Sequence, residues 1–125
     1  MRTTDIRTPG LFALLMLLSL AATPAAAHAT LDKSDPPVGS TVATAPHALT
    51  LTFTQNLEPA FSTVEVRDDR GARVDAGKAQ VDAGNRRVLR VGLRALAPGR
   101  YTVRWRVLSV DTHKTEGNFA FSVGR

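Results

Sequence analysis

Alternation of apolar and polar residues is the feature that most constrains how this chain can fold. It is clearest in ALTLTFT (48–54), FSTVEVRD (61–68), RRVLRVGL (86–93), YTVRWRVLSV (101–110) and GNFAFSV (117–123). A period of two puts alternate side chains on opposite faces of a strand, so each stretch predicts a half-buried strand. With shorter strands near 29–34 and 77–82, and a long Pro- and Gly-rich connection at 34–47, about seven strands are expected. We therefore predict an all-β, immunoglobulin-like (cupredoxin-like) domain, built as a sandwich or a small Greek-key barrel.

The first 27 residues have the features of a secretory signal peptide. Arg2 and Arg7 precede an apolar run, Leu11–Ala22, and the small residues Ala25 and Ala27 form a cleavage pattern. The run is too short to cross ~30 Å of hydrocarbon as a transmembrane helix. We expect cleavage after Ala27, export to the periplasm, and a mature domain over residues 28–125 without a membrane span.

Composition excludes several kinds of site. The chain has no cysteine, which rules out disulfides and thiolate metal ligands, and both methionines lie within residues 1–27. The net charge of +5 comes largely from arginines scattered through the expected strands. Such spacing indicates a solvated sheet face and not a nucleic-acid surface, which would cluster charge and interleave exposed aromatic residues.

Motifs for catalysis are missing from the sequence. It contains no nucleophile elbow, no phosphate-binding glycine loop and no HExxH pattern, so we do not expect an enzyme. The stretch SVDTHKTEG (109–117) is the remaining candidate. In an extended backbone, Asp111 and His113 would project to the same side and could share a cation. The alternative is an Asx turn with a surface histidine.

His28 could add further metal donors to those of the D-x-H pattern. As the first residue of a cleaved chain, it would offer its α-amine and imidazole Nδ1 to one metal ion. Adding His113 and Asp111 makes a set of three nitrogens and one carboxylate oxygen, which suits tetragonal Cu(II). Zinc is a lesser alternative. The metal-site prediction is therefore His28, Asp111 and His113, with Cu(II) as the ion.

Four stretches together make the chain resemble the CopC family of periplasmic copper-resistance proteins. They are AAAHATLDKSDPPVGS, LTFTQNLEPAFS, APGRYTVRWRVLSVDTH and GNFAFSV, which span nearly all of residues 28–125. The resemblance implies a seven-stranded Greek-key β-barrel that binds Cu(II) with high affinity. It also implies that His28 binds through both nitrogens, with Asp111 and His113 completing the plane.

Departures from the family pattern refine this expectation. Some members carry a methionine-rich Cu(I) loop, which residues 28–125 lack, so one Cu(II) site and no Cu(I) site are predicted. Gln55 stands where members often have a glutamate close to the copper. Glu58 is interpreted as a rim carboxylate and His47 as a surface-loop histidine. Arg106 has no derived role, although support of Asp111 is one option.

The functional hypothesis is an exported Cu(II)-binding protein that sequesters or delivers copper in resistance and homeostasis. Its partners would be the copper ion and, for delivery, a separate inner-membrane importer; a monomer is expected. One alternative is a copper-dependent monooxygenase, against which Asp111 argues because an anionic ligand disfavours reduced copper. The other is an immunoglobulin-like interaction module that ignores metal.

Overall fold

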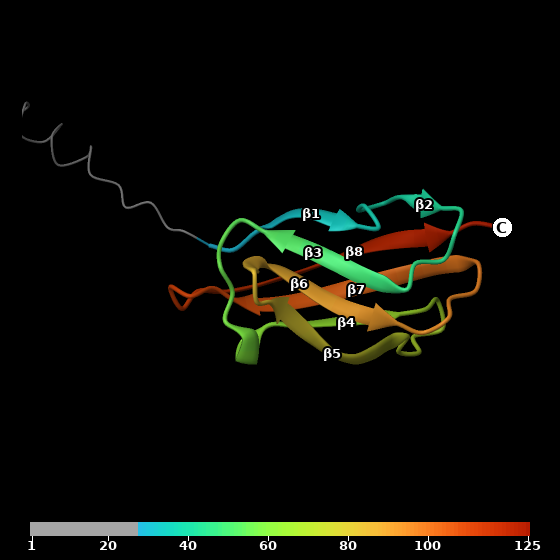
Figure 1. The fold of residues 1–125 in the computed structure, drawn as a ribbon. Coiled ribbons are helices and arrows are strands. Elements are labelled where there is room, and N and C mark those ends of the chain that lie inside the picture. Colours follow the sequence, from blue (N-terminus) through green and yellow to red (C-terminus); the bar gives the residue numbers. More distant parts are fainter. Residues whose placement is uncertain (1–27) are drawn as a thin grey trace, which may run out of the picture.

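The computed structural model describes residues 28–125, and the predicted signal peptide at 1–27 lies outside that part (Figure 1). The strands are β1 (Leu31–Asp35), β2 (Thr41–Val42), β3 (Ala48–Phe53), β4 (Thr63–Arg67), β5 (Asp75–Asp82), β6 (Asn85–Leu93), β7 (Gly99–Leu108) and β8 (Lys114–Val123). One 3-10 turn, η1 (Pro59–Phe61), is found in the described part of the chain and precedes β4. Within residues 28–125, no helix is long and apolar enough to cross a membrane.

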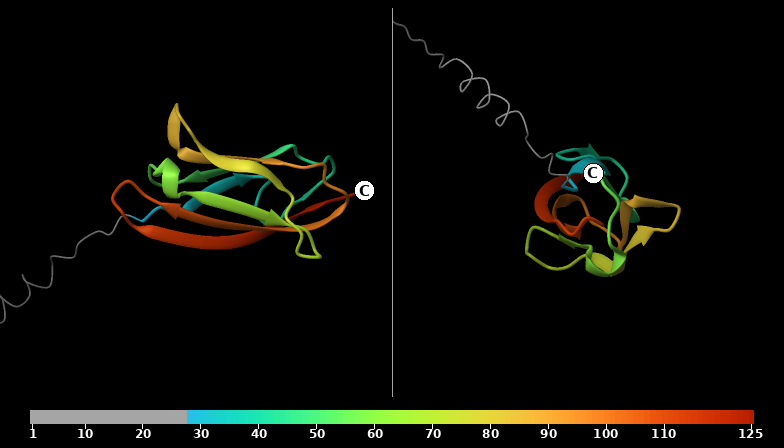
Figure 2. Two further views of the ribbon diagram at one scale, coloured as in Figure 1. Left: turned by 90° about the horizontal axis from the view of Figure 1, so that it is seen from below. Right: turned by 90° about the vertical axis from the view of Figure 1, so that its left-hand side faces the viewer.

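The strands form two four-stranded sheets, in the orders β1-β3-β6-β5 and β2-β8-β7-β4. All neighbours are antiparallel except the short β2–β8 pair, which is parallel. The two sheets face each other across the core in the end-on view of Figure 2. The all-β prediction is confirmed. Of the two predicted architectures, the separate sheets correspond to the sandwich and not to the closed barrel. The expected seven strands become eight because two residues of the 34–47 connection pair with β8 as β2.

Alternating apolar residues fill the space between the sheets, as the period-two pattern predicts. Leu49, Leu51 and Phe53 of β3 are at most 1% exposed. On the opposite sheet, Trp105 of β7 is 8% exposed, and its ring meets the Phe53 ring edge to face at a centroid distance of 5.1 Å. The sandwich is therefore held together by apolar burial from both sheets.

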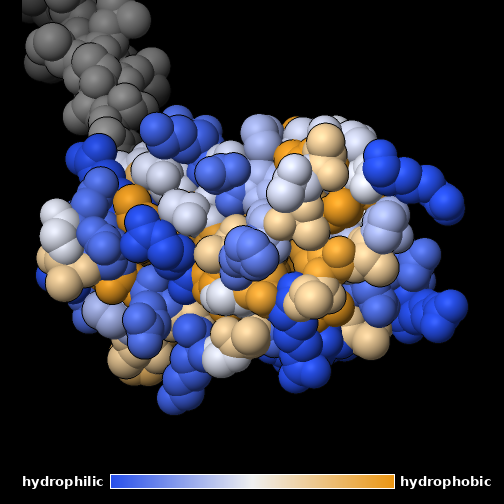
Figure 3. Space-filling view, turned by 45° about the vertical axis from the view of Figure 1, so that its right-hand side comes forward, coloured by the Kyte–Doolittle hydropathy of each residue, from blue (hydrophilic) through white to orange (hydrophobic). Residues whose placement is uncertain are grey.

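Charged side chains occupy the outer faces. The arginines of β6 and β7 are exposed, and on the face shown in Figure 3 hydrophilic residues surround smaller hydrophobic patches. Two ion pairs illustrate the pattern, Arg90 with Asp82 at 3.3 Å and Arg106 with Glu116 at 3.2 Å. These arginines form the solvated sheet face that the sequence predicts.

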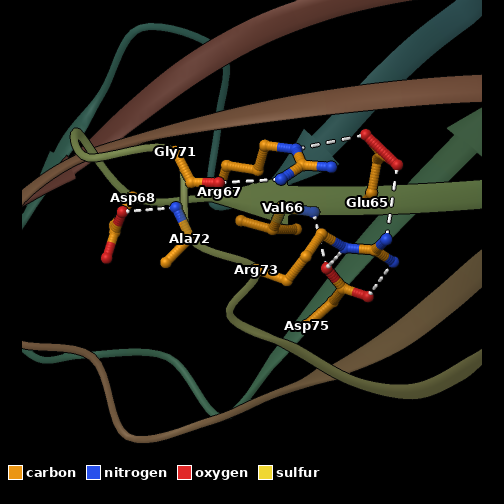
Figure 4. A network of polar contacts seen from close by, with 8 residues as sticks. All are labelled: Glu65, Val66, Arg67, Asp68, Gly71, Ala72, Arg73 and Asp75. Atoms are coloured by element: carbon orange, nitrogen blue, oxygen red, sulfur yellow. Dashed lines mark hydrogen bonds and ion pairs between the residues drawn. The ribbon is translucent and has the colours of Figure 1, made fainter.

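A buried carboxylate links the two sheets at one edge (Figure 4). Asp75 begins β5 and is 7% exposed. Its Oδ1 accepts hydrogen bonds from the Val66 backbone N–H of β4 at 2.9 Å and from Arg73 Nε at 2.8 Å, and its Oδ2 accepts from Arg73 Nη2 at 2.7 Å. Burial raises the pKa of Asp75, but the hydrogen bonds from Arg73 and Val66 outweigh it and hold the pKa below its ordinary value.

Replacing Asp75 with asparagine should lower the free energy of unfolding by about 1–3 kcal/mol at neutral pH, because an amide nitrogen then faces an arginine donor. The lowered pKa also sets the sign of the pH dependence. The stabilisation is present above the unfolded-state pKa of about 3.9 and is lost as the pH falls through the lower folded-state value. Urea unfolding at pH 7 and at about pH 3 measures both effects.

Asp82→Asn is the matched control, since Asp82 lies on the same strand but pairs with Arg90 at the surface. This variant should change the free energy of unfolding by no more than about 1 kcal/mol. Equal losses in the two variants would contradict the special role of the buried carboxylate.

Candidate metal centre

The start of the described chain and the β7–β8 hairpin lie at the same end of the sandwich. In Figures 1 and 2, the blue segment before β1, the end of β3 and the red-orange hairpin gather there, opposite the C-terminus. This arrangement brings residues 28–30 close to residues 109–115, although the two segments are far apart in sequence.

The N-terminal segment is held by the core and by two threonines. Ala29 is fully buried. On one side, Thr54 exchanges backbone and side-chain hydrogen bonds with Thr30, and its Oγ1 also donates to the His28 carbonyl at 3.2 Å. On the other side, Thr115 Oγ1 donates to the Ala29 carbonyl at 2.6 Å. These contacts direct His28 toward the hairpin.

A tight turn shapes the hairpin tip. The Ser109 N–H donates to the His113 carbonyl at 3.0 Å, and the Thr112 N–H donates to the Ser109 carbonyl at 2.9 Å. Thr112 has φ +73°, in the left-handed region that few non-glycine residues adopt. The segment is therefore not extended, and the His113 N–H lies 3.4 Å from Asp111 Oδ1, as in the Asx turn considered as the alternative. Asp111 and His113 come together because the backbone turns.

Asp111 sits between a buried hydroxyl and an imidazole. Ser109, which is fully buried, donates its hydroxyl to Asp111 Oδ1, and His113 Nδ1 lies 3.1 Å from the same oxygen. The Ser109 hydrogen bond, followed by that of His113, holds the pKa of the Asp111 carboxyl below its ordinary value. The carboxylate is thus anionic and oriented at neutral pH, although it is open to solvent.

The His28 and His113 rings meet edge to face, with centroids 4.6 Å apart and an interplanar angle of 86°. The structure therefore brings together His28, Asp111 and His113. Within residues 28–125, however, no three His, Cys, Asp or Glu side chains already stand in the arrangement of a bound metal. His113 Nδ1 instead faces Asp111 Oδ1 at 3.1 Å.

The other residues singled out from the sequence have different partners. Glu58 pairs with Arg86 at 3.4 Å. Arg106, considered as support for Asp111, pairs with Glu116 instead. His47 is exposed in the connection before β3, at the end of that strand away from His28.

Sequence reasoning missed three hydroxyls at this end of the sandwich. Ser109, Thr54 and Thr115 hold the hairpin and the N-terminal segment by the hydrogen bonds described above. For Ser109 there was a usable signal, because a serine two residues before an aspartate can donate to its carboxylate. Thr115 carried no signal, since its bond reaches a residue 86 positions away.

The family model described as the CopC domain matches residues 31–124, which contain every strand of both sheets. The chain belongs to the CopC family. This confirms the resemblance read from the sequence. The CopC-family chain is 37% identical to protein YobA of Escherichia coli (strain K12) over 114 residues, covering 90% of this chain and 92% of YobA.

Solved structures agree with this assignment. The chain is similar to CopC from Methylosinus trichosporium OB3b, with 35% identity and a TM-score of 0.73 over 78% of this chain and 94% of that one. It is also similar to PcoC, a methionine-rich copper resistance protein from Escherichia coli, with 34% identity and a TM-score of 0.68 over 78% and 99%. Unlike a methionine-rich protein, this CopC-family chain has no sulfur atom in residues 28–125, so nitrogen and oxygen are its available donors.

Proposed function

We propose that this CopC-family protein binds one Cu(II) ion as cargo through His28, Asp111 and His113. The observation that carries the proposal is the contact of two imidazole rings, 4.6 Å apart, beside a carboxylate already oriented by Ser109. Family membership and the copper resistance named for PcoC support the copper assignment.

The donor chemistry favours Cu(II) over other ions. Imidazole nitrogen and carboxylate oxygen suit tetragonal Cu(II), which also lies at the top of the divalent affinity order. Thiolate and thioether ligands, which select Cu(I), are absent from residues 28–125. Cleavage after Ala27 would add the His28 α-amine and complete a set of three nitrogens and one oxygen. The anionic Asp111 would stabilise Cu(II) over Cu(I), so binding is proposed and catalysis is not.

Sequestration or delivery of copper in the periplasm is the proposed role. The signal-like residues 1–27 support export, and a single Cu(II) site would suit a monomer that buffers copper. Delivery would require a recipient, for which a separate inner-membrane importer is our proposal. The candidate centre lies at the surface, with the Asp111 and His113 side chains partly open to solvent, so a recipient could reach the ion.

Titration with Cu(II) should test the site. For this test the full sequence is expressed in a bacterial host, and the mass of the purified product checks whether it begins at His28. We expect close to one equivalent of copper per chain and an electron paramagnetic resonance spectrum of tetragonal Cu(II) with nitrogen ligands. Binding of several equivalents, or a spectrum without nitrogen coupling, would contradict the proposal.

A second form of the protein measures how much the His28 α-amine contributes to Cu(II) binding. It carries a long extension of Gly and Ser residues ahead of His28, which turns the amine into an amide but keeps both imidazoles. We expect this form to bind Cu(II) more weakly and with fewer coupled nitrogens. Identical spectra and affinities would remove the amine from the ligand set.

A further inference from the structure

Thr115 connects the N-terminal segment to the sheet that carries His113. It lies on β8, two residues after His113, and its register partner is Val107, whose side chain is buried between the sheets. Thr115 is therefore on the inward face of β8, and its Oγ1 reaches the Ala29 carbonyl at 2.6 Å. Ala29 directly follows His28. The Thr115 hydroxyl therefore links the backbone next to His28 to the strand that begins just after His113.

The other hydrogen bonds of this segment lead to the opposite sheet. Within the described chain, residues 28–30 bond to Thr54, which directly follows β3 of the first sheet. The Thr115 bond is the one that reaches the β7–β8 sheet. Contact between the His28 and His113 rings therefore depends on this single cross-sheet hydrogen bond together with the burial of Ala29.

Loss of the hydroxyl would leave most of the fold in place. The buried Ala29 side chain and the hydrogen bonds between Thr30 and Thr54 would still hold the segment before β1 in place. The Ala29 carbonyl, however, would lose its donor, and the residue before it could move away from His113. A ligand that is held in place only part of the time lowers the apparent metal affinity by that fraction.

We infer that Thr115 is a positioning residue for copper: its hydrogen bond to the Ala29 carbonyl holds His28 beside His113 and so raises the Cu(II) affinity. The inference rests on the proposed function, because it assigns Thr115 to the same site. Thr115 makes no contact with the ion in this scheme. It acts through the backbone of the N-terminal segment.

Thr115→Val tests the inference, because valine keeps the shape and branching of threonine but lacks the hydroxyl. The Cu(II) affinity, measured by competition with a chromophoric chelator, should fall about tenfold, at the lower end of the effect of residues that support metal ligands. Thr115→Ser should keep most of the wild-type affinity, because serine keeps the hydroxyl donor. Thr102→Val, the same change at an exposed position of β7, should leave the affinity unchanged.

A His28→Ala background distinguishes positioning from a general structural role. When His28→Ala is combined with the Gly and Ser extension, neither the imidazole nor the α-amine that Thr115 positions is present, so Thr115→Val should have no further effect on the residual affinity. An equal loss in both backgrounds would show that Thr115 acts through His113 or the whole fold, and would overturn the inference. Urea midpoints of the metal-free proteins check the fold. If the valine variant is unfolded, the pair Thr115→Ser and Thr115→Ala makes the same comparison.

The outcomes also separate this inference from the proposed function. Failure of the wild-type protein to bind Cu(II) would overturn both. Normal binding by the wild type together with unchanged binding by Thr115→Val would overturn the positioning role alone.

Discussion

Replacing His113 with alanine is expected to lower the Cu(II) affinity by more than about 100-fold. Residues that merely support a metal ligand typically cost 10–100-fold when changed, so loss of a ligand should cost more. The substitution removes one of two imidazoles that lie 4.6 Å apart and also the direct contact with Asp111. Competition titration measures the affinity, and electron paramagnetic resonance should report the loss of one coupled nitrogen.

His47→Ala is the matched control for this experiment. His47 is an exposed histidine next to the start of β3, whereas the His28 carbonyl is bonded to Thr54 just beyond its end. Six residues of strand separate the two positions, which corresponds to roughly 20 Å. The control should bind copper as the wild type does. Similar losses in both variants would mean that copper binds elsewhere or non-specifically.

The largest expected effect on stability is that of Phe53→Ala, which should lower the free energy of unfolding by about 3–5 kcal/mol. Phe53 is 1% exposed and its ring packs against Trp105 from the other sheet. Removing it leaves a cavity between the two sheets that neighbouring side chains fill only in part. Small domains have total stabilities of about 5–15 kcal/mol, so this loss is a large share.

Phe61→Ala provides the comparison at an exposed position. Phe61 lies in η1 and is 65% exposed, so the same chemical change should alter stability by no more than about 0.5 kcal/mol. Urea unfolding can be followed by fluorescence of Trp105, the single tryptophan of the chain. Equal shifts of the two midpoints would contradict the described core.

Part of the candidate site was predictable because it is local. Asp111 and His113 are separated by one residue, so nearly any backbone conformation keeps them near each other. Their actual geometry comes from a turn in which Thr112 has a positive φ, which is the alternative to the extended backbone considered in the sequence. The spacing of Asp111 and His113 correctly indicated that the two side chains are close. The turn that orients them depends on Ser109, which is buried against the Asn56–Glu58 segment.

The inward-facing residues and the all-β class could be read from the sequence alone, because alternation within a strand is a local property. The absence of sulfur ligands in residues 28–125 was equally certain from composition. Tertiary structure alone determined that the strands form two four-stranded sheets, and that the segment after His28 lies against β8. These features depend on pairing between distant residues, such as Ala29 and Thr115, and no local pattern encodes which strands will meet.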